Sequence, residues 1–293
     1  MTDANSTVGT LSCLSSLALI TVSGADRFTF LQGQLTNDVT KLSNELMPAG
    51  YCSPKGRLLA TPRLFQESDT IGMIVAASNA DYLVKRLKMY VLRSKVTIEL
   101  AADREVAGFV GSAPTNLGDG ALVFELPCAL PQARIAAALP SGLGLAIVPK
   151  GTACAGSEPL WWAACAAAGQ SWVFGETAER FTPHAVNLDL IGGISFNKGC
   201  YTGQEVVSRI EHIGKTNRRT VLLAANDPLE LAPGTDLTDD QGQAVRQACR
   251  PYSPSGRSFR RDGSKRSCAR YNSGNTAPSA PALRLDPHQI SQK

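Results

Sequence analysis

Alternating hydrophobic and polar positions predict a series of short strands in the first 110 residues. In residues 14–23, Leu17 and Leu19 point to the opposite side from Ala18 and Ile20 if the segment is extended. The same kind of pattern predicts a hairpin in "YCSPKGRLLATPRLF", whose turn is Pro-Lys-Gly, and three further strands in "TIGMIVAA", "SKVTIELA" and "EVAGFVG". This order of strands indicates an α+β sheet domain.

Helical spacing interrupts the strands at two places in this region. Asn79 is expected to cap a helix in which Leu83, Leu87 and Tyr90 fall on one face. A shorter helix is predicted in residues 25–35, ended by Gly33. Residues 121–150 then repeat the alternation, with strands at 121–126 and 143–148 around a helix at 131–139. A further helix, "EPLWWAACAAA", is expected to begin after Ser157.

The segment "KGCYTGQE", residues 198–205, combines a cysteine with two glycines just before an amphipathic run. It follows "GGISF", which is predicted to be a short strand, and Thr202 with Glu205 fits a capping box at the start of a helix. Cys200 would then lie near the positive end of the helix dipole and near Lys198, and both favour the thiolate. Two interpretations stay open: a small buried hydrophobic residue at a tight turn, or a reactive thiol that contacts a ligand.

Charge is distributed unevenly along the chain. Residues 247–293 contain nine Lys or Arg and two Asp, for a net charge of +7, whereas the first 246 residues have a net charge of −3. That tail contains few aliphatic residues and many Ser, Pro and Gly, so it cannot bury enough apolar area to fold alone. Either the reading frame shifts near residue 246, or the tail is a disordered basic arm that binds nucleic acid.

The remaining composition narrows the class of protein. No apolar run is long enough to cross a membrane, so we expect a cytoplasmic protein and no membrane partner. The eight cysteines form no C-x-x-C pair, and a chain of 293 residues does not need disulfides for stability, which favours a reducing compartment. His184, His212 and Cys200 lack the spacing of metal ligands, and no metal site is expected.

Three blocks of this sequence resemble those of the YgfZ-type folate-binding proteins, within the aminomethyltransferase (glycine cleavage T-protein) superfamily. The blocks are "GGISFNKGCYTGQEVVSRI", "VSGADRFTFLQGQLTNDVTKL" and the hairpin, and the likeness covers roughly residues 14–246. The resemblance implies an α+β fold of three domains around a central channel that holds tetrahydrofolate, with a C-terminal β-barrel that is incomplete here. We therefore expect domains at 1–110 and 111–215, the start of the barrel at 216–246, and the tail at 247–293.

The resemblance also implies a role in the assembly or repair of iron–sulfur enzymes, including those that modify tRNA. It implies a thiol role for Cys200, and folate contacts within the segment and on the helices beside it. The expected contacts are Trp161, Lys198, Gly199, Tyr201, Gly203, Gln204, Glu205 and Arg209. The implied partners are folate, iron–sulfur enzymes or assembly proteins and, indirectly or weakly, tRNA; we expect a monomer.

Two departures from the superfamily bear on the chemistry. Aminomethyltransferases have acidic residues where this chain has Leu59 and Ala60, and neither side chain can accept a proton. A tryptophan of some relatives is replaced by Leu17, which leaves Trp161 as the expected aromatic partner of a pterin, with core packing as the alternative. The chain is therefore either an accessory protein or, less well matched, a folate-dependent one-carbon transferase.

Other polar groups have two interpretations each. Arg209 could pair with Glu205 one helical turn away or face the glutamate tail of folate. The polar residues of "LQGQLTNDV" could form a turn or bind a ligand. The loop around Arg218 and Arg219 is either a solvated run of charge or, with the tail, part of an RNA-binding module.

Overall fold

The computed structural model of the 293-residue chain describes residues 9–126, 142–213, 218–220, 224–225, 233–239, 244–247, 267–270 and 282–285. The chain divides into two compact units, Met1–Thr220 and Val221–Lys293. The predicted helix at 131–139 lies outside the described residues.

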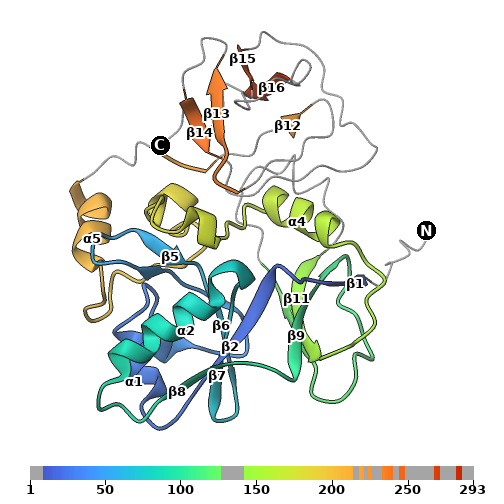
Figure 1. Cartoon of the computed structure of the whole chain (residues 1–293), viewed down its shortest axis with the longest axis vertical. Helices are drawn as coiled ribbons and strands as arrows, with labels where there is room; N and C mark the ends of the chain where they lie inside the picture. The colour runs from blue at the N-terminus through green and yellow to red at the C-terminus, as the bar shows by residue number, and fades with distance from the viewer. Residues whose placement is uncertain are drawn as a thin grey trace, which may run out of the picture. The chain divides into compact units, whose positions relative to one another are not determined.

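A five-stranded antiparallel sheet in the first unit has the strand order β3-β6-β7-β2-β8. Its strands are β2 (Leu17–Ser23), β3 (Met47–Pro48), β6 (Arg63–Glu67), β7 (Thr70–Ala76) and β8 (Thr97–Leu100). Helix α2 (Ala77–Val91) lies against this sheet (Figure 1) and inserts Leu83 and Leu87 into a core that also contains Ile20 and Val75. The apolar spacing seen in the sequence is therefore the buried side of the helix.

Asn79 does not cap that helix. Helix α2 begins at Ala77, with Ala76 rather than Asn79 at the cap position, and the Asn79 side chain is buried. Its Nδ2 donates a hydrogen bond to the carbonyl oxygen of Leu59 at 2.9 Å, which ties the helix to the neighbouring hairpin. An asparagine that is typical of a cap is used here to satisfy a strand carbonyl instead.

A second sheet of the first unit is four-stranded and antiparallel, in the order β1-β9-β11-β10. Its strands are β1 (Thr10–Cys13), β9 (Arg104–Val110), β10 (Leu122–Glu125) and β11 (Leu143–Pro149). Strand β9 pairs with β11 along its whole length, from Arg104 opposite Pro149 to Val110 opposite Leu143. Residues 1–110 and 111–215 therefore share one sheet.

Helix α4 (Glu158–Ala167) packs beside this second sheet (Figure 1). As the sequence predicts, Ser157 caps it by accepting a hydrogen bond from the Leu160 amide, and Pro159 lies in its first turn. The backbone leaves the helix at Gly169, which has a φ of +73°, a value that glycine adopts without strain.

Shorter elements connect the two sheets to the segment around Cys200. They are α1 (Arg27–Gln32), η1 (Val39–Lys41), β4 (Tyr51–Cys52), β5 (Leu58–Ala60), η2 (Gly175–Thr177), η3 (His184–Val186) and α5 (Gln204–Ile213). Strands β4 and β5 form the predicted hairpin, in which the Ser53 amide bonds to the Arg57 carbonyl and Gly56 takes a φ of +66° in the turn.

A disulfide bond joins Cys13 of β1 to Cys154, with a Cα–Cα distance of 5.5 Å. The two residues are 141 positions apart in the sequence, and no local pattern relates them. The prediction that the cysteines remain thiols is wrong for this pair. It failed because cysteine pairing depends on which strands and loops are adjacent, and sequence spacing does not report this.

The described residues of the second unit form one five-stranded antiparallel sheet, in the order β12-β16-β15-β13-β14. Its strands are β12 (Ala224–Ala225), β13 (Asp236–Asp239), β14 (Ala244–Gln247), β15 (Ser267–Arg270) and β16 (Ala282–Leu285). Within these residues β12 and β14 are edge strands, so the sheet is open and no closed barrel is present. Strands β15 and β16 come from the tail, and the rest of the tail after residue 247 lies outside the described residues.

No helix among the described residues has the length and apolarity needed to cross a membrane.

Candidate functional site around Cys200

Cys200 is exposed, unlike the other free thiols that the structure describes. Of the three free cysteines whose side chains the structure describes, Cys52 and Cys165 are buried. Burial raises the pKa of the Cys52 thiol to about 12, so that residue stays protonated and unreactive at neutral pH. Of the two interpretations of Cys200, a buried packing residue and an accessible thiol, the structure has the accessible thiol.

The backbone before α5 differs from the predicted strand and capping box. No strand forms in "GGISF"; residues 193–195 are irregular, and the Ser195 amide donates to the Thr36 carbonyl at 3.0 Å. Helix α5 begins at Gln204, so the residue before it is Gly203 rather than Thr202, and the predicted capping box is wrong. Residues 192–203 are polar and rich in glycine, and their backbone N–H and C=O groups can be hydrogen-bonded within loops as well as in a strand. The short alternating pattern in the sequence does not distinguish these two possibilities.

Gly203 is confined by the β4–β5 hairpin. It has a φ of +83°, and a Cβ at this position would lie 2.5 Å from the Ser53 carbonyl oxygen and 3.0 Å from the Gly56 Cα. Gly56 in turn would meet the Val206 side chain at 2.6 Å. The two glycines let the hairpin turn and the start of α5 touch backbone to backbone.

Gly199 lies in open space. No atom of the described residues comes within 4 Å of the position that a Cβ would take there, and its φ is not positive. The contrast leaves room on the protein surface directly beside the exposed Cys200.

Lys198 holds the loop of residues 32–37 against this segment. Its Nζ donates hydrogen bonds to three carbonyl oxygens, those of Gln32, Leu35 and Asn37, each at 2.7 Å. Burial lowers the pKa of the amine to about 8, so it is still mostly protonated at pH 7 and has the three donors that this arrangement requires. All three donors are used by the protein itself, which makes Lys198 a positioning residue for the loop.

The loop is further ordered by its own polar side chains. Gln32 Nε2 donates to Asp38 Oδ1 at 2.8 Å, and Gln32 Oε1 accepts from the Val39 amide at 2.8 Å. Hydrogen bonds from Thr40 lower the pKa of the Asp38 carboxyl group. These contacts support the turn-forming interpretation of Gln32 and Asp38.

The remaining candidates of the segment differ in exposure. Tyr201 is buried, and its ring centroid lies 5.2 Å from the Lys198 Nζ. Burial also raises the pKa of its hydroxyl group. Gln204 is half-buried, whereas Glu205 and Arg209 are exposed and form no ion pair with each other among the described residues. The exposed polar groups next to Cys200 are therefore free of the intrahelical pair that the spacing suggested.

An apolar cluster lies beneath the hairpin and α5. Its buried members are Cys52, Leu58, Val173, Val186, Leu188, Ile194 and Val207. Of the residues on α5, Val207 alone is fully buried, whereas Ile213 at the end of the helix is 82% exposed.

Trp161 belongs to the core and has no exposed surface. Its indole Nε1 donates to the Gly144 carbonyl oxygen at 2.8 Å, and its ring meets that of Trp162 edge to face with 4.8 Å between centroids. Trp162 also lies edge to face with Trp172. Trp161 therefore packs against the second sheet and has no ring face exposed near the segment that contains Cys200.

Leu59 and Ala60 in β5 are also buried, at 2% and 1% exposure. The positions that carry acids in the aminomethyltransferases are thus apolar and enclosed in this chain.

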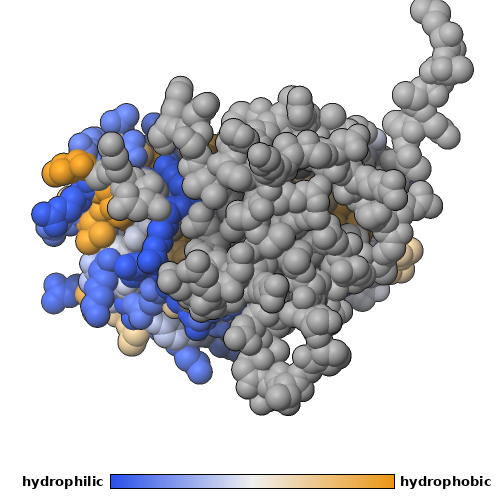
Figure 2. Space-filling model, turned by 90° about the horizontal axis from the view of Figure 1, so that it is seen from above, coloured by the Kyte–Doolittle hydropathy of each residue, from blue (hydrophilic) through white to orange (hydrophobic). Residues whose placement is uncertain are grey.

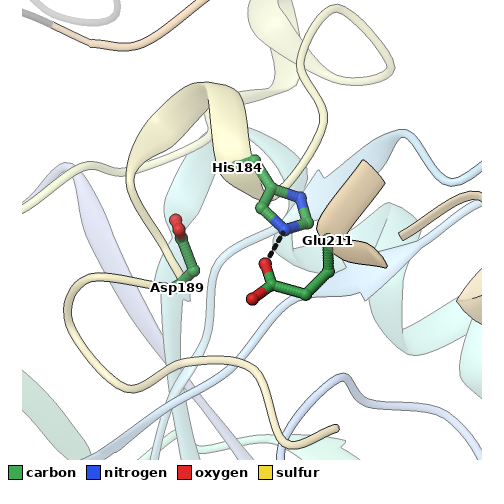
Figure 3. A group of neighbouring side chains, drawn as sticks. All are labelled: His184, Asp189 and Glu211. Atoms are coloured by element: carbon green, nitrogen blue, oxygen red, sulfur yellow. Dashed lines mark hydrogen bonds and ion pairs between the residues drawn. The ribbon is translucent and has the colours of Figure 1, made fainter. Parts of the chain in front are cut away.

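A polar cluster that the sequence analysis did not identify lies next to α5. Figure 3 shows His184 of η3 facing Glu211 of α5, with 3.1 Å between the histidine Nε2 and the carboxylate, and Asp189 nearby. These three residues are of types that bind metals, but Arg219 binds both carboxylate oxygens of Asp189, at 2.6 and 2.8 Å. A guanidinium in that place neutralises the carboxylate and repels a cation, so we interpret the cluster as an ion-pair network. The histidine and its acids are 5 and 27 residues apart, which explains why spacing did not reveal them.

The chain was compared with known proteins. No family model matches the chain. A tRNA-modifying protein YgfZ from Yersinia pestis (strain Pestoides F) is 33% identical over 258 residues, which cover 81% of this chain and 78% of the relative. A protein of the same name from Enterobacter sp. (strain 638) is 35% identical over 262 residues, with the same coverage.

The chain belongs to the YgfZ family. Its fold is similar to that of the glycine cleavage system aminomethyltransferase T from Bartonella henselae, with a TM-score of 0.61 over 97% of this chain and 86% of that protein. The sequence identity of 13% restricts this second likeness to the fold. The family expected from "KGCYTGQE" and the two upstream blocks is therefore confirmed.

Proposed function

We propose that this YgfZ-family protein binds tetrahydrofolate and supports the assembly or repair of iron–sulfur enzymes, including those that modify tRNA. The observation that carries the proposal is the exposed thiol of Cys200, held in a segment whose neighbours are fixed by the fold. The relatives are named tRNA-modifying proteins, and the similar solved fold is that of an aminomethyltransferase. A thiol of this kind can act as a nucleophile or a ligand, because it needs only deprotonation and access.

The backbone around Cys200 supports a ligand-contacting role. Lys198 and Gly203 fix the segment on both sides of the cysteine, through the three carbonyls and through the hairpin. Between them, Gly199 leaves the space beside the thiol open. A thiol held in place with room next to it is organised for a partner before that partner binds, which lowers the entropic penalty of binding.

The hairpin counts against the alternative of a glycine-cleaving transferase. Proton handling at the folate nitrogen needs a carboxylate, and Leu59 and Ala60 supply only apolar atoms. We accordingly assign the folate a supporting role in this protein. Its contacts in the proposed site would come from the exposed or half-buried groups Gly199, Gln204, Glu205 and Arg209.

Calorimetric titration of the purified protein with tetrahydrofolate tests the proposal. We expect saturable binding with one molecule per chain. Gly199→Phe, which fills the open space beside Cys200 without a backbone clash, should weaken that binding at least tenfold. Thr115→Phe, at an exposed position in another part of the first unit, is the matched control and should bind like the wild type. Absence of any binding to the wild type would contradict the folate part of the proposal.

A further inference from the structure

The outer side of helix α2 exposes large side chains that the proposed function does not use. Tyr82 is 48% exposed, Met89 65%, Tyr90 39% and Leu92, just after the helix, 89%. The opposite side of the same helix carries Leu83 and Leu87 in the core. One face of the helix therefore packs in the core, and the other exposes a second set of large side chains to solvent.

Positive charge is concentrated on the same segment. Residues 81–95 contain Lys85, Arg86, Lys88, Arg93 and Lys95 but only one acid, Asp81. This gives the segment a net charge of +4 in a body, residues 1–246, whose net charge is −3. Within the described residues none of the five cations takes part in an ion pair. Cations gathered without acidic partners create a positive local potential, which favours a polyanion.

Aromatic and cationic groups are interleaved on this surface. Tyr82, Lys85 and Met89 lie at i, i+3 and i+7, which places them on one side of the helix. At the end of the helix the Arg86 guanidinium lies 5.8 Å from the centroid of the Tyr90 ring. Residues 90–94 line an open hollow with a volume of about 720 Å³. At the left of Figure 2, hydrophobic residues in orange are set among hydrophilic ones in blue.

We propose that this surface, formed by Tyr82, Lys85, Lys88, Met89, Tyr90, Leu92, Arg93 and Lys95, binds RNA. Unpaired lysines and arginines meet the phosphates and release their counterions, and exposed tyrosines offer ring faces on which unpaired bases stack. An apolar protein partner would leave the four cations of this surface without counter-charges, which disfavours it. The inference goes beyond the proposed function, because it requires neither folate nor Cys200.

Fluorescence anisotropy with a labelled, unmodified tRNA transcript tests this surface in the full chain. Lys85→Glu/Lys88→Glu should weaken binding at least tenfold in 0.1 M salt and lower the slope of log K against log salt by about two, one for each lost phosphate contact. Tyr82→Ala should weaken binding about fivefold to tenfold through lost stacking. The control is Lys150→Glu, an exposed lysine at the end of β11, which should bind like the wild type.

Three results would overturn the proposal. The first is wild-type affinity in the double variant. The second is an equal loss in Lys150→Glu, which would mean that binding follows net charge alone or the basic tail. The third is stronger binding to vesicles containing anionic phospholipid than to the transcript, which would make this a membrane-binding surface. Tetrahydrofolate titration of the double variant distinguishes the two proposals, since its folate affinity should be unchanged.

Discussion

Trp161 and Cys200 were both expected at the folate site, Trp161 as an aromatic contact and Cys200 as a thiol, and the structure places them in opposite environments. Trp161 is enclosed in the core with its indole nitrogen bonded to Gly144, whereas Cys200 is exposed on a segment that other residues hold in place. The type of a residue indicates which ligand it could contact, but the packing around its side chain determines whether that ligand can reach it. An indole suits a pterin, but a face already packed against other rings is not available for one.

The largest effect is expected from Trp161. Replacing it with alanine should destabilise the first unit by about 3–5 kcal/mol, because a buried tryptophan leaves a large cavity and the Gly144 carbonyl loses its donor. Chemical denaturation followed by circular dichroism measures this. Leu160→Ala, at a position 53% exposed on the same helix, should change stability by well under 1 kcal/mol. A stable Trp161→Ala protein that has lost only folate binding would reverse the contrast drawn here.

Lys198→Met comes next. It removes the donor of three carbonyl oxygens and should destabilise the protein by about 2–3 kcal/mol, with faster amide hydrogen exchange in residues 32–38. Lys55→Met, at an exposed lysine of the hairpin turn, is the control and should alter neither quantity. Unchanged exchange in the loop of the Lys198 variant would show that the loop does not need the amine.

Substitutions of Gly203 and Gly199 form a matched pair, and their expected effect on stability is smaller. Gly203→Ala should destabilise the protein by about 1–3 kcal/mol, since it combines a φ of +83° with a 2.5 Å contact to the Ser53 carbonyl. Gly199→Ala meets no atom within 4 Å and should lie within about 0.5 kcal/mol of the wild type. Thermal unfolding of both variants checks this, and equal shifts would contradict the packing described for Gly203.

Cys200→Ser should have the smallest effect on stability, within about 0.5 kcal/mol, because the residue is exposed. Its effect on thiol chemistry should be large. At pH 8 a maleimide should modify Cys200 rapidly, while Cys52 stays unmodified because its thiolate forms only as the pH approaches about 12. Mass spectrometry of the labelled peptides measures both rates in one sample. Comparable labelling of Cys52 and Cys200 would contradict the burial difference.

The period of the hydrophobic positions and the turn-forming residues predicted much of the secondary structure of the first unit. The alternation in 17–23 and the Pro-Lys-Gly turn correspond to β2 and the β4–β5 hairpin, and the Ser157 cap begins α4 as expected. These features are local, so a single sequence contains the information that determines them. The start of α2 was misplaced because Asn79 bonds to a strand carbonyl instead of capping, and nothing near Asn79 in the sequence reports that contact.

The candidate site was predictable in its location and less so in its detail. "KGCYTGQE" indicated the family and singled out Cys200 without deciding whether it is buried or exposed, and the roles of Lys198 and Gly203 depend on distant residues. The carbonyls that bind Lys198 lie more than 160 positions earlier in the chain, and the Cys13–Cys154 bond spans 141. Long-range contacts of this kind follow from the fold as a whole, and residue spacing does not encode them.

The central claim is that the proposed support of tRNA-modifying enzymes requires the Cys200 thiol. A cellular assay tests this claim most directly. Cells that lack their own YgfZ protein would be given either the wild type or Cys200→Ser at equal abundance, and the methylthio content of their tRNA would be measured by mass spectrometry. The account predicts that the wild type restores the modification and that the serine variant, although folded and able to bind tetrahydrofolate, does not. Full restoration by Cys200→Ser would contradict it.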